Sequence, residues 1–256
     1  EIFGETTDVT CFGENNGSID ITVSGGTGNY SFEWSNNSNS EDIENLSVGV
    51  NSITVIDIDG CSSTSAEFSV NQPEVLELSV ATIDISCNGS TDGAANFTVS
   101  GGTPPYEFIS GYDIDENGIL NNLSAGIHSV TVLDNNNCET SIEFSINEPE
   151  LLELSVNTVD ASCFEGNDGA ANFTVSGGTP PFEFISGYDI DENGILNNLS
   201  TGFYYVEVVD NNNCVTAIEF TIDQPEALEL AVTTIDVSCN GGSDGFADLT
   251  INGDVE

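Results

Sequence analysis

The sequence contains no lysine, no arginine and no methionine, and it has a single histidine. Because no basic side chain is present to pair with them, its 44 aspartates and glutamates must be solvated, hydrogen-bonded or neutralised by cations from solution. A net charge of −44 repels the phosphates of nucleic acids and of anionic lipids, partners that lysine and arginine normally hold. The composition therefore excludes nucleic-acid binding and binding to anionic membrane surfaces.

Long apolar runs are also absent. No stretch of about 18 apolar residues occurs, so no segment is predicted to insert into a membrane. The first four residues, from Glu1 to Gly4, lack the pattern of a signal peptide, and we expect any export signal outside this stretch. Hydrophobic residues nevertheless make up 38% of the chain, in short runs separated by turn residues, which predicts a folded protein.

The cysteines reveal an internal repeat. A first series recurs every 76 residues and a second series lies between its members: Cys11, Cys87, Cys163 and Cys239, then Cys61, Cys138 and Cys214. Residues 94–124 and 170–200 differ only at Tyr106 against Phe182, which indicates recent duplication. Catalytic sites are rarely copied so faithfully side by side, so we do not expect an enzyme.

Apolar and polar residues alternate along six segments of each repeat, as in half-buried antiparallel strands. In the second copy we predict strands at residues 76–87, 95–100, 106–110, 118–123, 127–133 and 140–146. An Asn-Gly or Asp-Gly pair after each first-series cysteine, such as Asn16-Gly17, is a signal of a hairpin. The predicted fold is all-β, a tandem array of Ig-like antiparallel β-sandwich repeats with a period of 76 residues. The predicted repeats are residues 1–73 (truncated at the N-terminus), 74–149, 150–225 and 226–256 (partial).

Short proline segments recur at the predicted joints between repeats: Gln72-Pro73-Glu74, Glu148-Pro149-Glu150 and Gln224-Pro225-Glu226. Proline fixes its own φ angle, so these segments are expected to be short, stiff linkers. Repeats joined in this way are expected to lie end to end.

The regular cysteine spacing predicts disulfides, because a repeat of this size buries only a modest core. We predict bonds within repeats: Cys11 to Cys61, Cys87 to Cys138 and Cys163 to Cys214, which leaves Cys239 without a partner. This pairing requires both cysteines of a repeat to lie at the same end of the sandwich, as they would with six strands. If residues 111–123 formed two strands, bonds between repeats would follow, such as Cys87 to Cys214 or Cys61 to Cys87.

Two acidic loops match the first half of a calcium-binding loop, with oxygen-bearing residues at alternate positions and a glycine for the sharp turn. The residues concerned are Asp113, Asp115 and Asn117, then Asp189, Asp191 and Asn193. The bidentate glutamate expected at the twelfth position is replaced by Ser124 or Ser200. Calcium is therefore the one cofactor that the sequence suggests, and an acidic solvated hairpin is the alternative.

The segments that begin at Asp57, Asp134 and Asp210 also carry several oxygens and could present them to a cation. Aspartate, however, typically caps such tight turns through its own backbone, with glycine or asparagine as the left-handed residue. We therefore favour a structural turn at these positions.

His128 and Trp34 each occur once in the chain. The counterparts of His128 are Asn51 and Tyr204, so a structural position at the start of a strand is predicted. Trp34 stands where the other repeats have serine, and we predict core or edge packing for it, with stacking on a sugar as the alternative.

Five motifs recur along the chain and are best seen in its second repeat: Cys87-Asn-Gly-Ser-Thr-Asp-Gly93, Gly101-Gly-Thr-Pro-Pro-Tyr106, Leu123-Ser-Ala-Gly126, Val132-Leu-Asp134 to Cys138, and Ile146-Asn-Glu-Pro149. Together they resemble the SprB repeat of Bacteroidetes cell-surface adhesins. The resemblance implies large repetitive proteins that the type IX system exports across the outer membrane, some of which mediate gliding and attachment.

This resemblance predicts an extracellular segment at the bacterial cell surface that acts as a structural and adhesive stalk. The implied partners are a surface or glycan ligand at a distal tip and the outer-membrane secretion and motility machinery, and lateral or filament assembly is a further expectation. A calcium-dependent matrix or surface-layer module and a glycan-binding module are the alternatives.

Overall fold

The computed structural model describes residues 1–253, and for residues 63–66 it describes the backbone alone. Within this part the regular structure is antiparallel β-strand, with no helix that could cross a membrane. The chain divides into two compact units, Glu1–Asp84 with Thr91–Asn147, and Ile85–Ser90 with Glu148–Glu256. The boundaries predicted after residues 73, 149 and 225 stay predictions.

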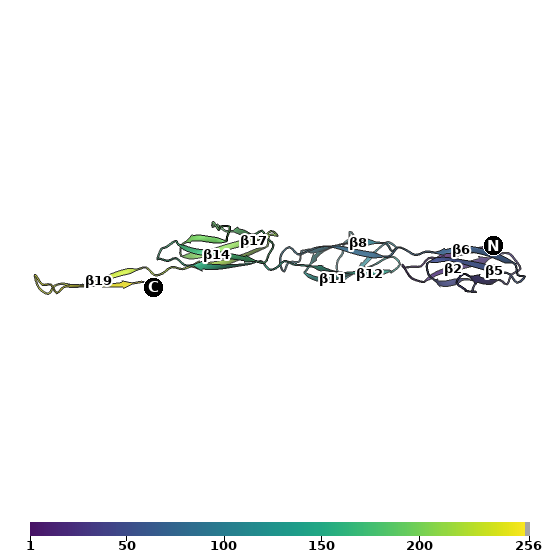
Figure 1. Ribbon diagram of the computed structural model, residues 1–256, viewed down its shortest axis with the longest axis horizontal. Coiled ribbons are helices and arrows are strands. Elements are labelled where there is room, and N and C mark those ends of the chain that lie inside the picture. The colour runs from purple at the N-terminus through teal and green to yellow at the C-terminus, as the bar shows by residue number, and fades with distance from the viewer. Residues whose placement is uncertain (254–256) are drawn as a thin grey trace. The chain divides into compact units, whose positions relative to one another are not determined.

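The first unit contains two sets of six strands. The first set, which we call repeat 1, consists of β1 (Ile2–Thr7), β2 (Gly17–Val23), β3 (Ser31–Trp34), β4 (Ile43–Leu46), β5 (Gly49–Ile56) and β6 (Ser62–Val70). The second set, repeat 2, consists of β7 (Glu77–Ile83), β8 (Gly93–Ser100), β9 (Glu107–Ile109), β10 (Ile119–Leu123), β11 (Gly126–Leu133) and β12 (Glu139–Ile146). Figure 1 labels β2, β5 and β6 of the first set and β8, β11 and β12 of the second.

The second unit contains a third set and a single hairpin. The third set, repeat 3, consists of β13 (Glu153–Val159), β14 (Gly169–Ser176), β15 (Glu183–Ile185), β16 (Ile195–Leu199), β17 (Gly202–Val209) and β18 (Val215–Ile222). The hairpin pairs β19 (Glu229–Ile235) with β20 (Phe246–Asn252).

Each repeat is built from two three-stranded antiparallel sheets that enclose a hydrophobic core. In repeat 2 the strand orders are β7-β8-β10 and β9-β11-β12, and the other two repeats follow the same plan. In repeat 1 the core combines Ile19 and Ile21 of one sheet with Ile53 and Val55 of the other. The alternation of apolar and polar residues in the sequence predicts these inward-facing side chains. The predicted all-β class is confirmed.

The six-strand count is confirmed, but β9 and β10 do not reverse direction. β8 and β11 both start at the end of the repeat that contains Leu123 and Gly126. β10 is antiparallel to β8, and β9 is antiparallel to β11. The chain therefore runs the same way through β9 and β10, and changes sheet between them. As a result, the loop after β7 and the turn between β11 and β12 lie at opposite ends of the repeat.

The hairpin signalled by Asn16-Gly17 is confirmed, because β1 and β2 pair antiparallel, but the pair itself is not the turn. Residues 8–16 connect β1 to β2, and Gly17 is the first residue of β2. A Cβ atom on Gly17 would lie 2.6 Å from Val70 Cγ1, so this glycine permits close packing at the strand end. The Asn16 side chain accepts a hydrogen bond from Thr10 N (3.0 Å) and orders the longer loop instead.

Candidate functional site

The loop after the first strand of each repeat carries a first-series cysteine and is anchored to the end of the same repeat. In repeat 1, Asn71 N donates to Asp8 Oδ1 (2.7 Å), and Val9 N donates to Asn71 O (3.0 Å). Gly13 N donates to Gln72 Oε1 (3.1 Å), the residue that precedes the linker proline. The position of Cys11 is therefore fixed relative to the linker.

Repeats 2 and 3 build the same anchor. The two aspartate contacts are Asn147 N to Asp84 Oδ1 and Asp223 N to Asp160 Oδ1, both 2.9 Å, and the linker contacts are Gly89 N to Glu148 Oε2 (2.8 Å) and Glu165 N to Gln224 Oε1 (2.9 Å). The backbone N–H of Asn147 and then its side-chain amide hold the pKa of the Asp84 carboxyl below its ordinary value. The strand predicted to extend to Cys87 therefore ends at Ile83, where this anchor begins.

The opposite end of each repeat carries a second-series cysteine in a tight turn. Cys61 N donates to Asp57 Oδ1 (2.8 Å), and Cys138 N and Cys214 N make the same bond to Asp134 and Asp210, each at 2.9 Å. The left-handed positions are Gly60 (φ 80°), Asn137 (φ 63°) and Asn213 (φ 65°). The predicted aspartate-capped turn is confirmed, and the Cys61 N–H is the main cause of the lowered pKa of Asp57.

Disulfides join the first-series cysteine of one repeat to the second-series cysteine of the next. The bonds are Cys11–Cys138 and Cys87–Cys214, with Cα–Cα distances of 5.7 and 5.6 Å and a sequence separation of 127 residues in both. The predicted bonds within repeats, Cys11 to Cys61, Cys87 to Cys138 and Cys163 to Cys214, are therefore wrong. The common direction of β9 and β10 places the two cysteines of one repeat at opposite ends. Cys61, Cys163 and Cys239 are free and exposed.

A side-chain amide accompanies each disulfide. Asn136 Nδ2 donates to Thr10 O (3.0 Å), across the boundary between repeats 1 and 2. Asn212 Nδ2 donates in the same way to Ser86 O (2.9 Å) beside Cys87–Cys214. We call this combination of a disulfide and an amide contact the inter-repeat joint. Neither asparagine was predicted from the sequence, because their Asn-Asn-Asn runs are typical of turn residues.

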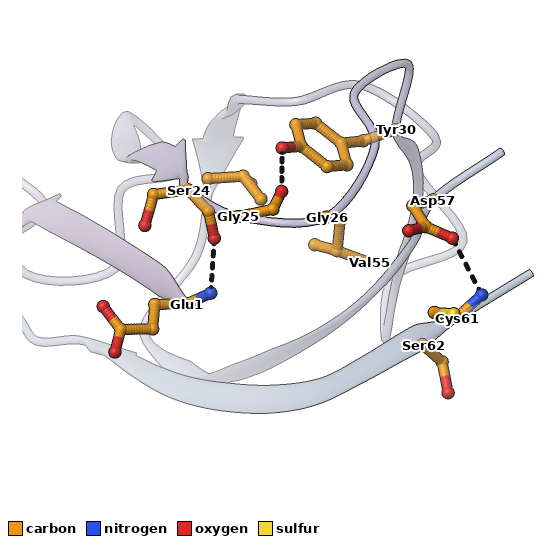
Figure 2. A pocket seen from close by; sticks show the side chains of 10 residues that line it. Glu1, Ser24, Gly25, Gly26, Tyr30, Val55, Asp57, Cys61 and Ser62 are labelled. Atoms are coloured by element: carbon orange, nitrogen blue, oxygen red, sulfur yellow. Dashed lines mark hydrogen bonds between the residues drawn. The ribbon is translucent and has the colours of Figure 1, made fainter. Parts of the chain in front are cut away.

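A hollow lies beside Cys61 in repeat 1 (Figure 2) and is lined by Gly26, Tyr30 and Asp57, among others. Gly26 corresponds to Gly102 of repeat 2, where a Cβ atom would lie 2.9 Å from Leu76 Cδ1. Leu76 is buried, and Leu152 is its equivalent in repeat 3. The hollow is thus the place where the other repeats hold the leucine that precedes their first strand, which makes it a packing seat.

The two predicted calcium loops are closed by their own aspartates. Asp115 Oδ1 accepts from Ile119 N (2.7 Å) and Asn117 N (2.9 Å), and Asp191 does the same in repeat 3. The Ile119 N–H is the main cause of the lowered pKa of Asp115; burial opposes it, and Asn117 adds a further lowering effect. Among the described residues no three His, Cys, Asp or Glu side chains are grouped to hold a metal ion. Calcium binding at Asp113, Asp115 and Asn117 and at Asp189, Asp191 and Asn193 stays a prediction.

His128 is buried on β11 and serves the local packing. Its Nε2 lies 2.9 Å from Ser124 O, its Nδ1 lies 2.9 Å from the Tyr112 hydroxyl, and its ring stacks on Phe144. A carbonyl oxygen only accepts, so Nε2 carries a proton, while Nδ1 and the Tyr112 hydroxyl share a second hydrogen bond. The predicted structural position is confirmed.

Trp34 belongs to the core of repeat 1. It is 4% exposed, packs on Phe68 with ring centroids 6.0 Å apart, and donates from Nε1 to Ser40 O (2.9 Å). The core interpretation is confirmed, and the buried ring offers no face for a sugar.

The family model of the SprB repeat matches residues 4–39, 79–111 and 155–187. No curated protein sequence matches the chain significantly. Similar solved structures include the eight N-terminal Ig domains of Down syndrome cell adhesion molecule isoform 1.30.30 (13% identity, 76% of this chain and 32% of that chain, TM-score 0.40). Others are domains 1–6 of the surface-layer protein SbsC (12%, 99% and 49%, 0.33) and invasin, a bacterial integrin-binding protein (12%, 98% and 67%, 0.30). These similarities concern the all-β class alone.

Proposed function

This chain carries SprB repeats and so belongs to the SprB-repeat family, and on that premise we propose that it is a stalk segment of a repetitive bacterial cell-surface adhesin. The observation that carries the proposal is the inter-repeat joint, which occurs twice with the same pairing and the same sequence separation. A protein whose task is to hold a distal part away from the cell needs connections of this kind between its units.

The joint adds a second covalent connection to the linker at each repeat boundary. A linker alone leaves two repeats free to rotate, whereas a disulfide and an amide contact at the same boundary restrict that rotation. Repeats that contact their neighbours in this way form a one-dimensional array whose length grows with the number of repeats. Length and restricted bending are the properties that a spacer requires.

The chemistry of the joint supports an extracellular location. Disulfides persist in oxidising environments outside the cytosol, and the stalk is therefore proposed to stand on the bacterial surface. Its acidic surface, with no lysine or arginine, keeps the array soluble and repels other anionic surfaces. Attachment through a tip ligand, a role in gliding and export by the type IX system are the finer parts of the proposal.

Surface labelling tests the location. Antibodies raised against this chain should label intact cells of the producing bacterium, and external protease should remove the label without lysis. A periplasmic protein would serve as the matched control for intact cells. Labelling that appears only after permeabilisation would contradict the proposal.

Small-angle scattering tests the spacer itself. We expect the oxidised protein to have a maximum dimension several times that of a compact sphere of its mass, because each repeat encloses its own core. The reduced protein should show a broader distribution of dimensions, since only the linkers then restrict its repeats. A near-spherical oxidised particle would rule out the spacer.

A further inference from the structure

The two disulfides obey one rule, in which a first-series cysteine bonds to the second-series cysteine 127 residues later. Applied to the free cysteines, the rule places the partner of Cys61 before residue 1. It places the partners of Cys163 and Cys239 after residue 256. The three free cysteines are therefore those for which this chain itself offers no partner.

Cys163 already lies in a finished half of a joint. Its loop has the anchor of the bonded repeats, with Asp223 N bound to Asp160 Oδ1 (2.9 Å) and Ala161 N to Asp223 O (2.9 Å). Ser162 N donates to Asp168 Oδ1 (3.0 Å), as Thr10 N does to Asn16 in the bonded loop of repeat 1. The loop therefore has the same hydrogen bonds as the disulfide-bonded loops, although its cysteine is free.

Cys61 lies in the complementary half. Its turn has the backbone bond from Asp57 N to Cys61 O (3.0 Å) that also closes the turns of Cys138 and Cys214. Asp57 Oδ1 caps Cys61 N as Asp134 caps Cys138 N. One residue differs, because Asp59 occupies the position of Asn136 and Asn212. A carboxylate has no hydrogen to donate to the carbonyl that those asparagines bind.

We propose that Cys163 and Cys61 are the two complementary halves of a further inter-repeat joint, through which this chain bonds end to end to repeats of its own kind. Cys163 forms a disulfide with the second-series cysteine of a following repeat. Cys61 forms one with the first-series cysteine of a preceding repeat. The inference rests on the geometry of the two closed joints and holds whether or not the array stands on a cell surface.

Bond formation requires a low-molecular-weight disulfide as oxidant. The Cys163 thiolate attacks one of its sulfurs and releases the first small thiolate, which leaves a mixed disulfide on Cys163. The Cys61 thiolate of the next repeat then attacks the Cys163 sulfur and releases the second small thiolate. Two protein thiols and one small disulfide thus become one protein disulfide and two small thiols.

A tandem protein brings the two halves together in the correct register. Residues 1–228 of a first copy are followed directly by the full chain as the second copy, so that Leu228 precedes Glu1 as Leu152 precedes Glu153. This order continues the 76-residue period of the first-series cysteines. It also supplies a leucine for the hollow beside Cys61 in Figure 2.

After equilibration with oxidised and reduced glutathione, thiol alkylation and non-reducing peptide mapping give the result. If both copies keep their two disulfides, five cysteines lie outside them: Cys61 and Cys163 of the first copy, and Cys61, Cys163 and Cys239 of the second. We expect three alkylated thiols and a peptide that links Cys163 of the first copy to Cys61 of the second. Five alkylated thiols, or a bond from Cys163 to any other cysteine, would overturn the proposal.

Two variants of the second copy sharpen the test. Cys61→Ser should leave four alkylated thiols and no new cross-linked peptide. Asp59→Asn restores the amide donor, and at a fixed glutathione ratio it should favour the new bond by about 2- to 10-fold, the usual value of one hydrogen bond. Peptides that contain Cys11–Cys138 report in every variant whether the repeats have folded.

Discussion

Repeats 1 and 2 differ most along their sides and least at their ends. Ile21 N of repeat 1 donates to the Asp42 side chain (2.9 Å), whereas its counterpart Phe97 N of repeat 2 donates to Gly118 O (2.8 Å). The same strand position is thus completed by two unrelated loops. At the ends, by contrast, the aspartate-capped turns and the anchored loops are built in the same way in both repeats.

The difference indicates where the constraint on this chain lies. A side loop must only satisfy its own strand, so many sequences can serve there. An end must meet the neighbouring repeat with a sulfur and a backbone carbonyl at fixed positions. We infer that the repeat is defined by its joints.

Removal of one disulfide should have the largest effect. Cys138→Ser opens a bond that closes a chain segment across repeats 1 and 2, and it should lower the free energy of unfolding by up to about 5 kcal/mol on the chain-entropy model. Cys61→Ser is the matched control, because that cysteine occupies the same turn without a bond. Denaturant titration measures both, and equal stabilities would show that the joint contributes nothing to the fold.

Two glycines of repeat 2 differ in the space around them. Gly101 has a φ of 69° and a Cβ atom there would clash with Val75 O, whereas Gly89 has a φ of 76° and no atom within 4 Å of such a Cβ. Both alanine variants carry backbone strain, but Gly101→Ala adds a steric clash. We expect Gly101→Ala to cost about 1–3 kcal/mol more than Gly89→Ala. Thermal unfolding of the two variants would contradict this if they were equally stable.

The amide contact should have a smaller effect. Asn136→Asp reproduces the residue found at position 59 and removes the donor to Thr10 O. The equilibrium constant for forming Cys11–Cys138 in a glutathione buffer should fall by about 2- to 10-fold. Asn135→Asp places the same charge on the neighbouring residue and is the control. An equal effect of both substitutions would assign the change to charge alone.

The anchors predict a specific response to acid. The lowered pKa of Asp84 means that its carboxylate stabilises the fold fully above the ordinary value of 3.8 and loses this effect as the pH falls through the lowered value. Asp84→Asn should therefore show a shallower loss of stability below about pH 4. Other carboxylates are protonated over the same range and relieve the repulsion within the chain, so the difference between protein and variant is the quantity to measure. Parallel curves would contradict the assignment.

Calcium should have the smallest effect. The carboxylates of Asp115 and Asp191 each already accept hydrogen bonds from two backbone N–H groups. Only some of their lone pairs are therefore left for a cation. We expect millimolar calcium to raise the melting temperature by a few degrees at most, and Asp113→Asn with Asp189→Asn to abolish that rise. A tight calorimetric isotherm, or a collapse of the array on adding chelator, would favour the calcium-dependent module instead.

The sequence allowed the strands and the turn caps to be predicted because each depends on local information. Alternation selected the buried residues of β8 and β12, and the spacing from Asp57 to Gly60 predicted a turn closed by its own side chain. The hairpin signalled by Asn16-Gly17 was also found from local information, but a packing contact with Val70, and not a turn, explains that glycine.

The disulfide pairing could not be predicted from the sequence because it depends on strand direction. Alternation shows which face of a strand is buried and contains no information about the direction in which the strand runs. β9 and β10 therefore looked like an ordinary pair with a reversal, although the chain only changes sheet between them. The amide of Asn136 was missed because its acceptor, Thr10 O, lies 126 residues away in the sequence.

The two disulfides also overlap along the chain, because Cys87 precedes Cys138. The shortest covalent route from Cys11 to Cys214 crosses to Cys138, runs back to Cys87 and crosses again. Under tension this route becomes taut first, so a pulling force passes through residues 87–138 while residues 12–86 and 139–213 stay slack. Fully unfolded, the span from Cys11 to Cys214 would stop at roughly 170 Å, against roughly 680 Å for the reduced chain. The two disulfides thus limit the unfolded length of this span to about a quarter of that of the reduced chain.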